Sequence, residues 1–338
     1  MRKLGFVAMV IMALAAAAGA PRPRFVPPGE VVAPIEGVAF SPDSRTLAGA
    51  SWDNSVILWD AAGGARLRTL GGHESAVNSV AWRPDGRALV SASNDRTLME
   101  WDTASGERRR TFTGHLDGVT SVVYSPDGRL LASGSMDRTV ILWNVATGER
   151  RRTLAGHAKG VTCVAFSPDG RSLASASWDE TVIVWDVASG AQRRTINGHH
   201  APVSSVAFSP DGRLLATGSA DRTVILWDMA RGERLRAFEG HTDAVTSVAF
   251  SPDGRFLATG SEDDNAIEWD AATGELLHTL VGHTKGVTSV AFSGDGNTLA
   301  AGSRDGRVIL WDAASGAPQR VVTGKSSGVV GPSAWRRP

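Results

Sequence analysis

The side chains of a Ser-His-Asp catalytic triad recur along this chain at a constant spacing. His157, for example, is followed by Ser175 and Asp179. In a hydrolase, a triad of this kind activates the serine for nucleophilic attack. The same set occurs in five places, however, and a hydrolase needs its catalytic site only once. The repetition therefore favours a structural role for these residues, and we expect no catalytic residue among them.

The spacing follows a period of 42 residues that runs through most of the sequence. Tryptophans mark this period at Trp59, Trp101, Trp143, Trp185, Trp227, Trp269 and Trp311. Each is followed by Asp, except that Asn144 follows Trp143. Aspartates keep the same spacing at Asp53, Asp95, Asp137, Asp179, Asp221, Asp263 and Asp305, and Gly-His pairs keep it at His73, His115, His157, His199, His241 and His283. A regular period of this length indicates a repeat architecture, here of seven units over residues 31–324.

Each unit contains four short segments that favour β-strands. In residues 119–155, the first segment, 119–124, is rich in β-branched and aromatic residues. Ser125-Pro126-Asp127-Gly128 is typical of a type I turn, because proline presets φ at its second position. Strands are expected next at 130–135, 139–143 and 150–154, and no segment has the length and period of a helix. The sequence therefore predicts an all-β fold.

Composition excludes several functional classes. Among 338 residues, 35 are Lys or Arg and 35 are Asp or Glu, so the formal net charge of zero argues against a globally basic nucleic-acid binder. Cys163 is the only cysteine, which excludes an internal disulfide and a cysteine-based metal site. It occupies the first-strand position of Ser121 and Ser205, so we interpret it as a packed residue.

The combination of Gly-His, Ser-Pro-Asp-Gly and Trp-Asp motifs in one register resembles the WD-repeat β-propeller family. The resemblance covers most of the chain. It implies an all-β, seven-bladed β-propeller of four-stranded antiparallel blades around a central channel. This agrees with elementary physics, because a single blade cannot cover both of its faces and a closed ring leaves no blade uncovered. The resemblance also implies a non-catalytic protein–protein interaction scaffold without a cofactor.

In the family that the chain resembles, the recurring polar residues form a structural network. The tryptophan indole N–H donates to a strand hydroxyl, the hydroxyl donates to His, and the other His nitrogen donates to Asp. Five sets are complete: His73/Ser91/Asp95/Trp101, His115/Ser133/Asp137/Trp143, His157/Ser175/Asp179/Trp185, His199/Thr217/Asp221/Trp227 and His241/Thr259/Asp263/Trp269. Ala301 replaces the hydroxyl in the last unit, and Val31 and Gly49 replace His and hydroxyl in the first. We therefore expect the first and last blades to be the least stable.

Either end of the chain could supply the strand that completes the last blade. We expect residues 319–322 to form it from the C-terminal side. The alternative is Arg24 to Val26, but Pro27 and Pro28 follow directly, and proline suits only edge strands. Residues 325–338 are then a C-terminal tail.

Differences between the units indicate where a partner could bind. The turn position before each recurring Asp holds Trp52, Asn94, Met136, Trp178, Ala220, Glu262 and Arg304. The loops after the Gly-His pairs add Asp117, Lys159, Asp243 and Lys285 to the same side of the ring, which we call the top face. Exposed tryptophan and methionine are enriched at interfaces. We expect a protein or peptide partner here; the alternative is ordinary turn variation, with both tryptophans stacked on neighbouring loops.

Arginines are concentrated on the fourth strands, at Arg108, Arg109, Arg110, Arg150, Arg151, Arg152, Arg193, Arg194, Arg234 and Arg236. Charge on an outermost strand discourages edge-to-edge pairing, which is the explanation we favour. The alternative is a basic rim for anionic lipid headgroups or polyanions. Nucleic acid is not expected, because the aromatic residues that stack on single strands are absent from these strands.

Two further possibilities are a metal site and a ligand in the channel. Asp263 and Asp264 beside Glu262 lack the spacing of a calcium loop, and His200 and His278 have no companion ligands, so we expect no metal. The alternative function is an enzyme or small-ligand binder that uses the central channel. That function would need an asymmetric cluster of acids, bases or ligands, and the repeated sets are symmetric.

The first twenty residues differ from the rest. A short basic start, an apolar run from Leu4 to Ala18 and small residues afterwards are typical of a secretory signal peptide, with cleavage expected after Ala18. The alternative is an uncleaved membrane anchor formed by residues 4–20. Residues 21–30 are a proline-rich linker. We therefore expect an exported monomer, periplasmic, in the cell envelope or secreted, that contacts a membrane only if the segment is not cleaved.

Overall fold

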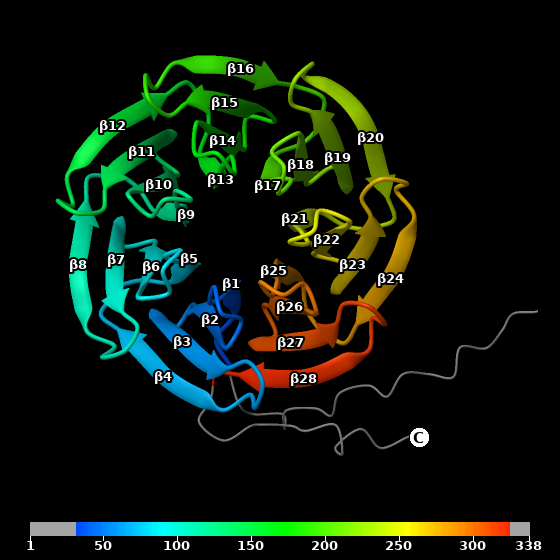
Figure 1. Cartoon of the computed structure of the whole chain (residues 1–338), viewed down its shortest axis with the longest axis horizontal. Coiled ribbons are helices and arrows are strands. Elements are labelled where there is room, and N and C mark those ends of the chain that lie inside the picture. The colour runs from blue at the N-terminus through cyan, green and yellow to red at the C-terminus, as the bar shows by residue number, and fades with distance from the viewer. Residues whose placement is uncertain (1–31, 325–338) are drawn as a thin grey trace, which may run out of the picture.

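The computed structural model describes residues 32–324 of the chain. The predicted signal peptide or anchor (1–20), the linker (21–30) and the C-terminal tail (325–338) lie outside the described residues. The described part contains 28 strands and no helix. The strands form seven four-stranded sheets, and each sheet uses four consecutive strands of the chain. Figure 1 shows these sheets as blades around a central axis, so the predicted seven-bladed all-β propeller is confirmed.

The strands fall into four classes by their place in a blade. The innermost strands are β1 (Ile35–Phe40), β5 (Val77–Trp82), β9 (Val119–Tyr124), β13 (Val161–Phe166), β17 (Val203–Phe208), β21 (Val245–Phe250) and β25 (Val287–Phe292). The second strands are β2 (Thr46–Ser51), β6 (Ala88–Ser93), β10 (Leu130–Ser135), β14 (Ser172–Ser177), β18 (Leu214–Ser219), β22 (Phe256–Ser261) and β26 (Thr298–Ser303). The third strands are β3 (Ser55–Asp60), β7 (Thr97–Asp102), β11 (Thr139–Asn144), β15 (Val182–Asp186), β19 (Thr223–Asp228), β23 (Asn265–Asp270) and β27 (Arg307–Asp312). The outer strands are β4 (Arg66–Gly71), β8 (Arg108–Thr113), β12 (Arg150–Ala155), β16 (Gln192–Ile196), β20 (Glu233–Glu239), β24 (Leu276–Val281) and β28 (Pro318–Thr323).

The hydrophobic core lies between neighbouring blades rather than inside any one of them. Between blades 3 and 4, Leu142 and Leu154 of one sheet pack with Val164, Leu173 and Trp185 of the next, and all are buried. Seven such clusters fill the seven junctions. Burying a large apolar side chain is worth roughly 1.5–3 kcal/mol. Since every blade contributes to two clusters, each blade is stabilised by both of its neighbours.

A basic side chain on each outer strand connects its blade to the next. Arg110 donates to the carbonyl oxygens of Val145 and Ala146, at 3.2 and 3.0 Å, in the turn between the third and outer strands of blade 3. Equivalent bonds to the following blade come from Arg68, Arg152, Arg194, Arg236 and Arg320, and His278 takes this position in blade 6. Gly148 in the receiving turn has φ +78°, and a Cβ there would lie 2.6 Å from the Arg110 guanidinium. Four of the ten clustered arginines, Arg110, Arg152, Arg194 and Arg236, thus act as links between blades.

Within residues 32–324, the ring closes between blades 7 and 1 through two sheets that each consist of four consecutive strands. β28 pairs with β27, so the outer strand of blade 7 comes from the C-terminal side, as expected. Ile35, Val38 and Trp59 of blade 1 pack with Val308 and Val322 of blade 7. The indole N–H of Trp59 also donates to the carbonyl oxygen of Thr323 at 3.1 Å. Closure is therefore made by packing and hydrogen bonds between two complete sheets.

Candidate functional site

The recurring polar residues form one hydrogen-bonded chain in each of blades 2 to 6. In blade 4, the Trp185 indole N–H lies 2.8 Å from Ser175 Oγ, which lies 2.8 Å from His157 Nε2. The other ring nitrogen, Nδ1, lies 2.9 Å from Asp179 Oδ2. The other complete sets have the same connections, at distances of 2.7–2.9 Å. Each chain joins the loop that enters a blade to the second and third strands.

Burial and hydrogen bonding fix the charges in this network. Burial lowers the pKa of His73, His199 and His241, because desolvation disfavours the imidazolium. Burial alone would raise the pKa of Asp221. The hydrogen bonds that its carboxylate accepts from Thr223, from the His200 backbone and from His199 outweigh this effect and lower the pKa to about 2. In blade 5, the neutral imidazole of His199 therefore donates to the ionised carboxylate of Asp221, and each donor has an acceptor.

The position of the hydroxyls argues against a catalytic use of these sets. Ser91, Ser133 and Ser175, with Thr217 and Thr259, are 0% exposed. A hydroxyl that no substrate can reach cannot act as a nucleophile. The arrangement supports the blades and holds the loops above them in place.

The first and last blades lack part of this network. In blade 7, His283 Nδ1 lies 3.0 Å from Asp305 Oδ2, but Ala301 offers no hydroxyl to Nε2, which lies 3.1 Å from the Ala301 carbonyl oxygen. In blade 1, a Cβ on Gly49 would lie 2.6 Å from the Trp59 ring, so only glycine leaves room for the indole at this position. The network is thus reduced on both sides of the closing junction.

The top face is built from the turns between second and third strands and the loops that enter the blades. The backbone N–H of Trp178 donates to the carbonyl oxygen of Gly160, and that of Trp52 donates to Pro34, each at 3.0 Å. Asn94, Met136, Ala220, Glu262 and Arg304 make the equivalent bond in their own blades. The loop residues are held similarly, since the Ser135 hydroxyl donates to the Asp117 carbonyl at 3.0 Å. The structure therefore places both groups of predicted binding residues on one side of the ring.

Two tryptophans dominate this face. Trp52 and Trp178 are each 48% exposed, while the seven tryptophans of the repeat motif are buried. Trp52 belongs to blade 1 and Trp178 to blade 4, and Figure 1 shows these blades on opposite sides of the ring. Met136 is half-buried, and its sulfur lies against Gly160, whose carbonyl accepts from Trp178. Met136 and Trp178 thus border the same loop.

The other predicted residues differ in their freedom to bind. Asn94, Arg304, Asp117, Lys159, Asp243 and Lys285 are exposed, and Glu262 is half-buried. Arg304 donates to Glu262 at 2.7 Å, and the Asn94 side chain accepts from Asn78 at 2.7 Å. These bonds fix the orientation of three side chains before any partner arrives.

Two residues of this face were not singled out from the sequence. Leu116, in the loop that enters blade 3, is 83% exposed. Glu36 stands where most other blades have a Ser or Thr whose hydroxyl donates to the next blade, as Thr162 does to the Val203 carbonyl at 2.7 Å. Glu36 Oε1 is buried and has no hydrogen-bond partner among residues 32–324. It lies 3.8 Å from Arg304 Nε, and burial raises the pKa of this carboxyl. Comparing each position across the repeats would have found both residues.

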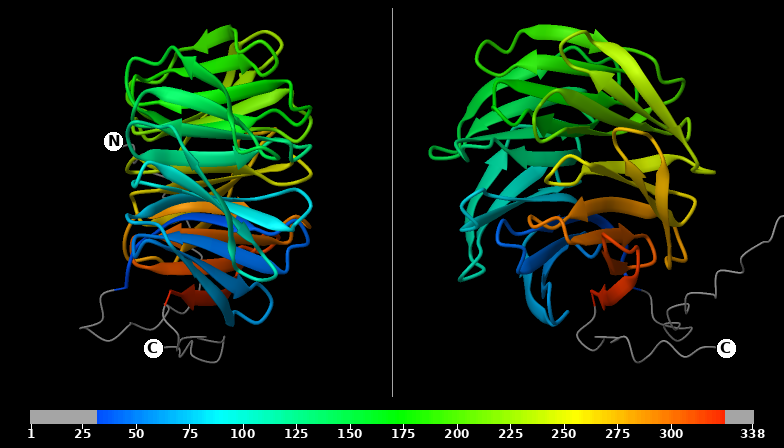
Figure 2. Two further views of the ribbon diagram at one scale, coloured as in Figure 1. Left: turned by 90° about the vertical axis from the view of Figure 1, so that its left-hand side faces the viewer. Right: turned by 45° about the vertical axis from the view of Figure 1, so that its right-hand side comes forward.

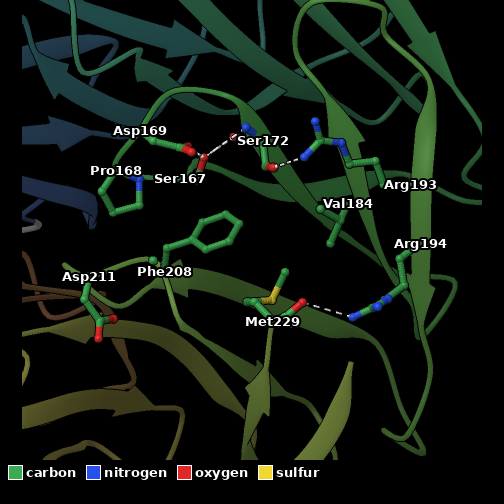
Figure 3. Close-up of a pocket in the computed structure, with 11 residues that line it drawn as sticks. Ser167, Pro168, Asp169, Ser172, Val184, Arg193, Arg194, Phe208, Asp211 and Met229 are labelled. Atoms are coloured by element: carbon green, nitrogen blue, oxygen red, sulfur yellow. Dashed lines mark hydrogen bonds between the residues drawn. The ribbon is translucent and has the colours of Figure 1, made fainter. Parts of the chain in front are cut away.

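The opposite face, which carries the Ser-Pro-Asp-Gly turns, contains grooves between blades. Figure 3 shows the groove between blades 4 and 5, about 510 Å³ in volume, with Val184, Phe208 and Met229 in its wall. Its arginines are already engaged, since Arg193 donates to Ser172 Oγ at 2.9 Å and Arg194 donates to the Met229 carbonyl at 3.2 Å. Comparable grooves lie between blades 1 and 2 and between blades 7 and 1, so this feature belongs to the repeating frame.

Three further features concern metal ligands, membrane-spanning helices and the single cysteine. Within residues 32–324, no three His, Cys, Asp or Glu side chains are grouped so that they could hold a metal ion. The same range contains no helix long and apolar enough to cross a membrane. Burial raises the pKa of the Cys163 thiol, whose sulfur lies 3.8 Å from the Val206 carbonyl oxygen in the junction between blades 4 and 5. This environment does not favour the reactive thiolate.

Comparison with known proteins agrees with this geometry. Seven segments match the family model for the WD domain, G-beta repeat: residues 28–60, 64–102, 106–144, 148–186, 190–228, 232–270 and 274–312. A search of curated proteins finds no match to the chain.

Proposed function

Because the chain belongs to the WD-repeat family of β-propellers, we propose that it is a non-catalytic scaffold that binds a protein or peptide on its top face. Propellers of this family generally serve as non-enzymatic scaffolds for protein interactions. The family match does not identify a binding face or binding residues. Our proposal for both rests on the chemistry of this chain's own loops.

The observation that carries the proposal is the pair of half-exposed indoles, Trp52 and Trp178, on opposite sides of the ring. Exposed tryptophan is costly to leave in water and contributes strongly to interfaces, where it is a frequent hot spot. The loops beneath each indole are tied to their blades, so a partner does not have to order them on binding. A ligand that spans the channel mouth would contact both indoles.

Polar residues around the channel would add specificity. Lys159 and Lys285 alternate with Asp117 and Asp243 on the loops, so the face presents charges of both signs. Rim charges of this kind influence the rate and selectivity of association more than its strength. We therefore assign the main binding energy to the two tryptophans.

The test is affinity capture with wild-type protein and a Trp52→Ala/Trp178→Ala double variant, followed by measurement of Kd for the captured partner. Losing hot-spot residues should weaken binding by at least about 30-fold, equivalent to about 2 kcal/mol. The matched control is Leu67→Ala/Leu276→Ala, which removes two exposed side chains from outer strands. Equal binding by the double variant and wild type would refute the proposed face, and unfolding of the double variant would show that the indoles belong to the core.

We propose further that the protein is exported. The support is the basic start, the apolar run and the small residues of positions 1–20. N-terminal sequencing of the mature protein tests this proposal. A first residue at Gly19 would indicate cleavage, whereas an intact Met1 in a membrane fraction would indicate an anchor.

A further inference from the structure

A β-bulge on each outer strand aims one side chain back toward the recurring Trp-Asp pair. In blade 3, Leu142 pairs with Arg152 and Trp143 pairs with Arg150, so Arg151 is the extra residue between them. Bulges re-aim a side chain in this way. The bulged residues of blades 2 and 4 are also arginines, and each one reaches the aspartate of its own blade. Arg109 lies 2.5 Å from Asp102, and Arg193 pairs with Asp186.

Blade 3 lacks the acidic partner because Asn144 replaces the aspartate. The amide oxygen of Asn144 still accepts the turn bonds from the backbone N–H groups of Ala146 and Thr147, at 2.9 and 3.1 Å. In blade 2, Asp102 accepts the equivalent pair at 2.9 and 2.8 Å. Asn144 therefore keeps the turn and removes the negative charge. Among residues 32–324, Arg151 has no acidic partner within 4.0 Å, and it is exposed.

Neighbouring cations increase the positive charge at this point. Arg150 is exposed and, within the same described range, forms no ion pair. Arg110 reaches over from blade 2 to the Val145 and Ala146 carbonyls, which accept hydrogen bonds but do not neutralise its charge. Glu149 is the only acid between Asn144 and Ala155.

The outer strands differ in charge from blade to blade. Residues 270–281 of blade 6 carry Asp270 and Glu275 and no lysine or arginine, and the whole chain has a formal net charge of zero. The outer strands β8, β12 and β16 follow one another along one side of the ring in Figure 1, and the left panel of Figure 2 looks onto this side. The arginines of β8, β12 and β16 thus form one continuous stretch of the outer rim, and further arginines lie on β4, β20 and β28.

From this arrangement we infer that the outer strands of blades 2 to 4, centred on Arg150 and Arg151, bind the phosphate headgroups of an anionic membrane surface. The rim offers several cations on extended strands, which matches a surface that carries many phosphates. This choice of surface rests on the proposed export: a chain that the apolar run of residues 4–20 brings to a membrane would meet anionic headgroups there. This contact is independent of the proposed partner on the top face and would orient the channel relative to the membrane.

The test is cosedimentation of the full-length protein with vesicles of neutral lipid and with vesicles that contain an acidic phospholipid. Because the apolar N-terminal segment is the same in every variant, differences between variants report the rim. Each arginine near an anionic surface contributes about fivefold to binding. We expect Arg150→Gln/Arg151→Gln to bind acidic vesicles about 25-fold more weakly than wild type, and added salt to weaken wild-type binding.

Two single substitutions sharpen the test. Asn144→Asp keeps every arginine and restores the Trp-Asp sequence of the other blades, so it should fold normally and weaken vesicle binding about fivefold by pairing Arg151. Arg234→Gln removes an outer-strand arginine from blade 5, beside Glu233 and Asp228, and should bind like wild type.

Equal binding to neutral and acidic vesicles, or no effect of Asn144→Asp and the double variant, would overturn the inference. Binding of inorganic polyphosphate or DNA without binding of vesicles would also overturn it. Because Trp52→Ala/Trp178→Ala should leave vesicle binding unchanged, the failure of one proposal can be told from the failure of the other.

Discussion

Glu268 provides the strongest prediction about stability, because it is a buried acid without a partner. It lies on β23 in the junction between blades 6 and 7, is 0% exposed, and neither carboxylate oxygen accepts a hydrogen bond from the described residues. Most other blades place an apolar residue at this position: Leu58, Leu142, Val184, Leu226 and Leu310. Blade 2 also has an acid here, Glu100, but the next blade supplies Tyr124, whose hydroxyl donates to it at 2.9 Å. At the corresponding position, the blade that follows Glu268 has Phe292.

Burial, and then the negative charge of Asp312, raise the pKa of Glu268 from 4.5 to about 7. The other titratable group that faces it is His278, directly opposite on β24. The pKa of Glu268 is higher in the folded state than in the unfolded state. The contribution of Glu268 to the free energy of unfolding is therefore most favourable below about pH 4.5, where the carboxyl is protonated in both states. Stability then falls as the pH rises toward 7 and stays low above that. By linkage the cost is about 1 kcal/mol at pH 5 and about 3 kcal/mol at pH 8.

The assay is denaturant unfolding of wild type and Glu268→Leu at both pH values. The stability gained by the variant should be about 2 kcal/mol larger at pH 8 than at pH 5. Phe292→Tyr offers the hydroxyl that Tyr124 gives to Glu100, so it should recover part of this gain while keeping the acid. A gain that is equal at the two pH values, or a loss of stability at pH 8, would refute the reasoning.

Three further predictions concern the frame. His157→Ala should cost about 1–3 kcal/mol in denaturant unfolding, because it leaves Ser175 and Asp179 without their buried partner; an unchanged midpoint would contradict a structural network. Gly148→Ala should cost about 1–2 kcal/mol, since its φ is +78° and the new Cβ would meet Arg110, whereas the control Gly71→Ala, with no atom within 4 Å, should cost less. Amide hydrogen exchange should be faster in blades 1 and 7 than in blade 4, and the reverse order would show that the missing hydroxyls do not weaken the ring ends.

Most of the propeller's blades and strands could be predicted from the sequence, because they are marked by particular side chains at fixed intervals. The 42-residue period fixed the number of blades, and segments 119–124 and 130–135 coincide with β9 and β10. The repeated His, Ser or Thr, Asp and Trp meet as expected because each blade brings the same positions together.

The remaining features depend on the neighbouring blade or on backbone atoms. Arg110 donates to the backbone carbonyls of Val145 and Ala146, and every residue has a backbone carbonyl whatever its side chain. The sequence therefore does not show that Arg110 links two blades. The sequence shows that Glu268 lacks a hydrogen-bond donor only when it is compared with Phe292, the residue that faces it from the next blade. Likewise, Gly49 shows that a hydroxyl is missing from blade 1, but not that the Thr323 carbonyl takes over the bond to Trp59.

The closure of the ring has a consequence for how such a chain can evolve. In the described part of the chain, each blade is a complete sheet made from one uninterrupted stretch of four consecutive strands. Duplication or loss of one repeat therefore adds or removes a complete four-stranded sheet. For the same reason, new termini cut between any two blades, with the old ends joined, should yield a permuted chain that still assembles.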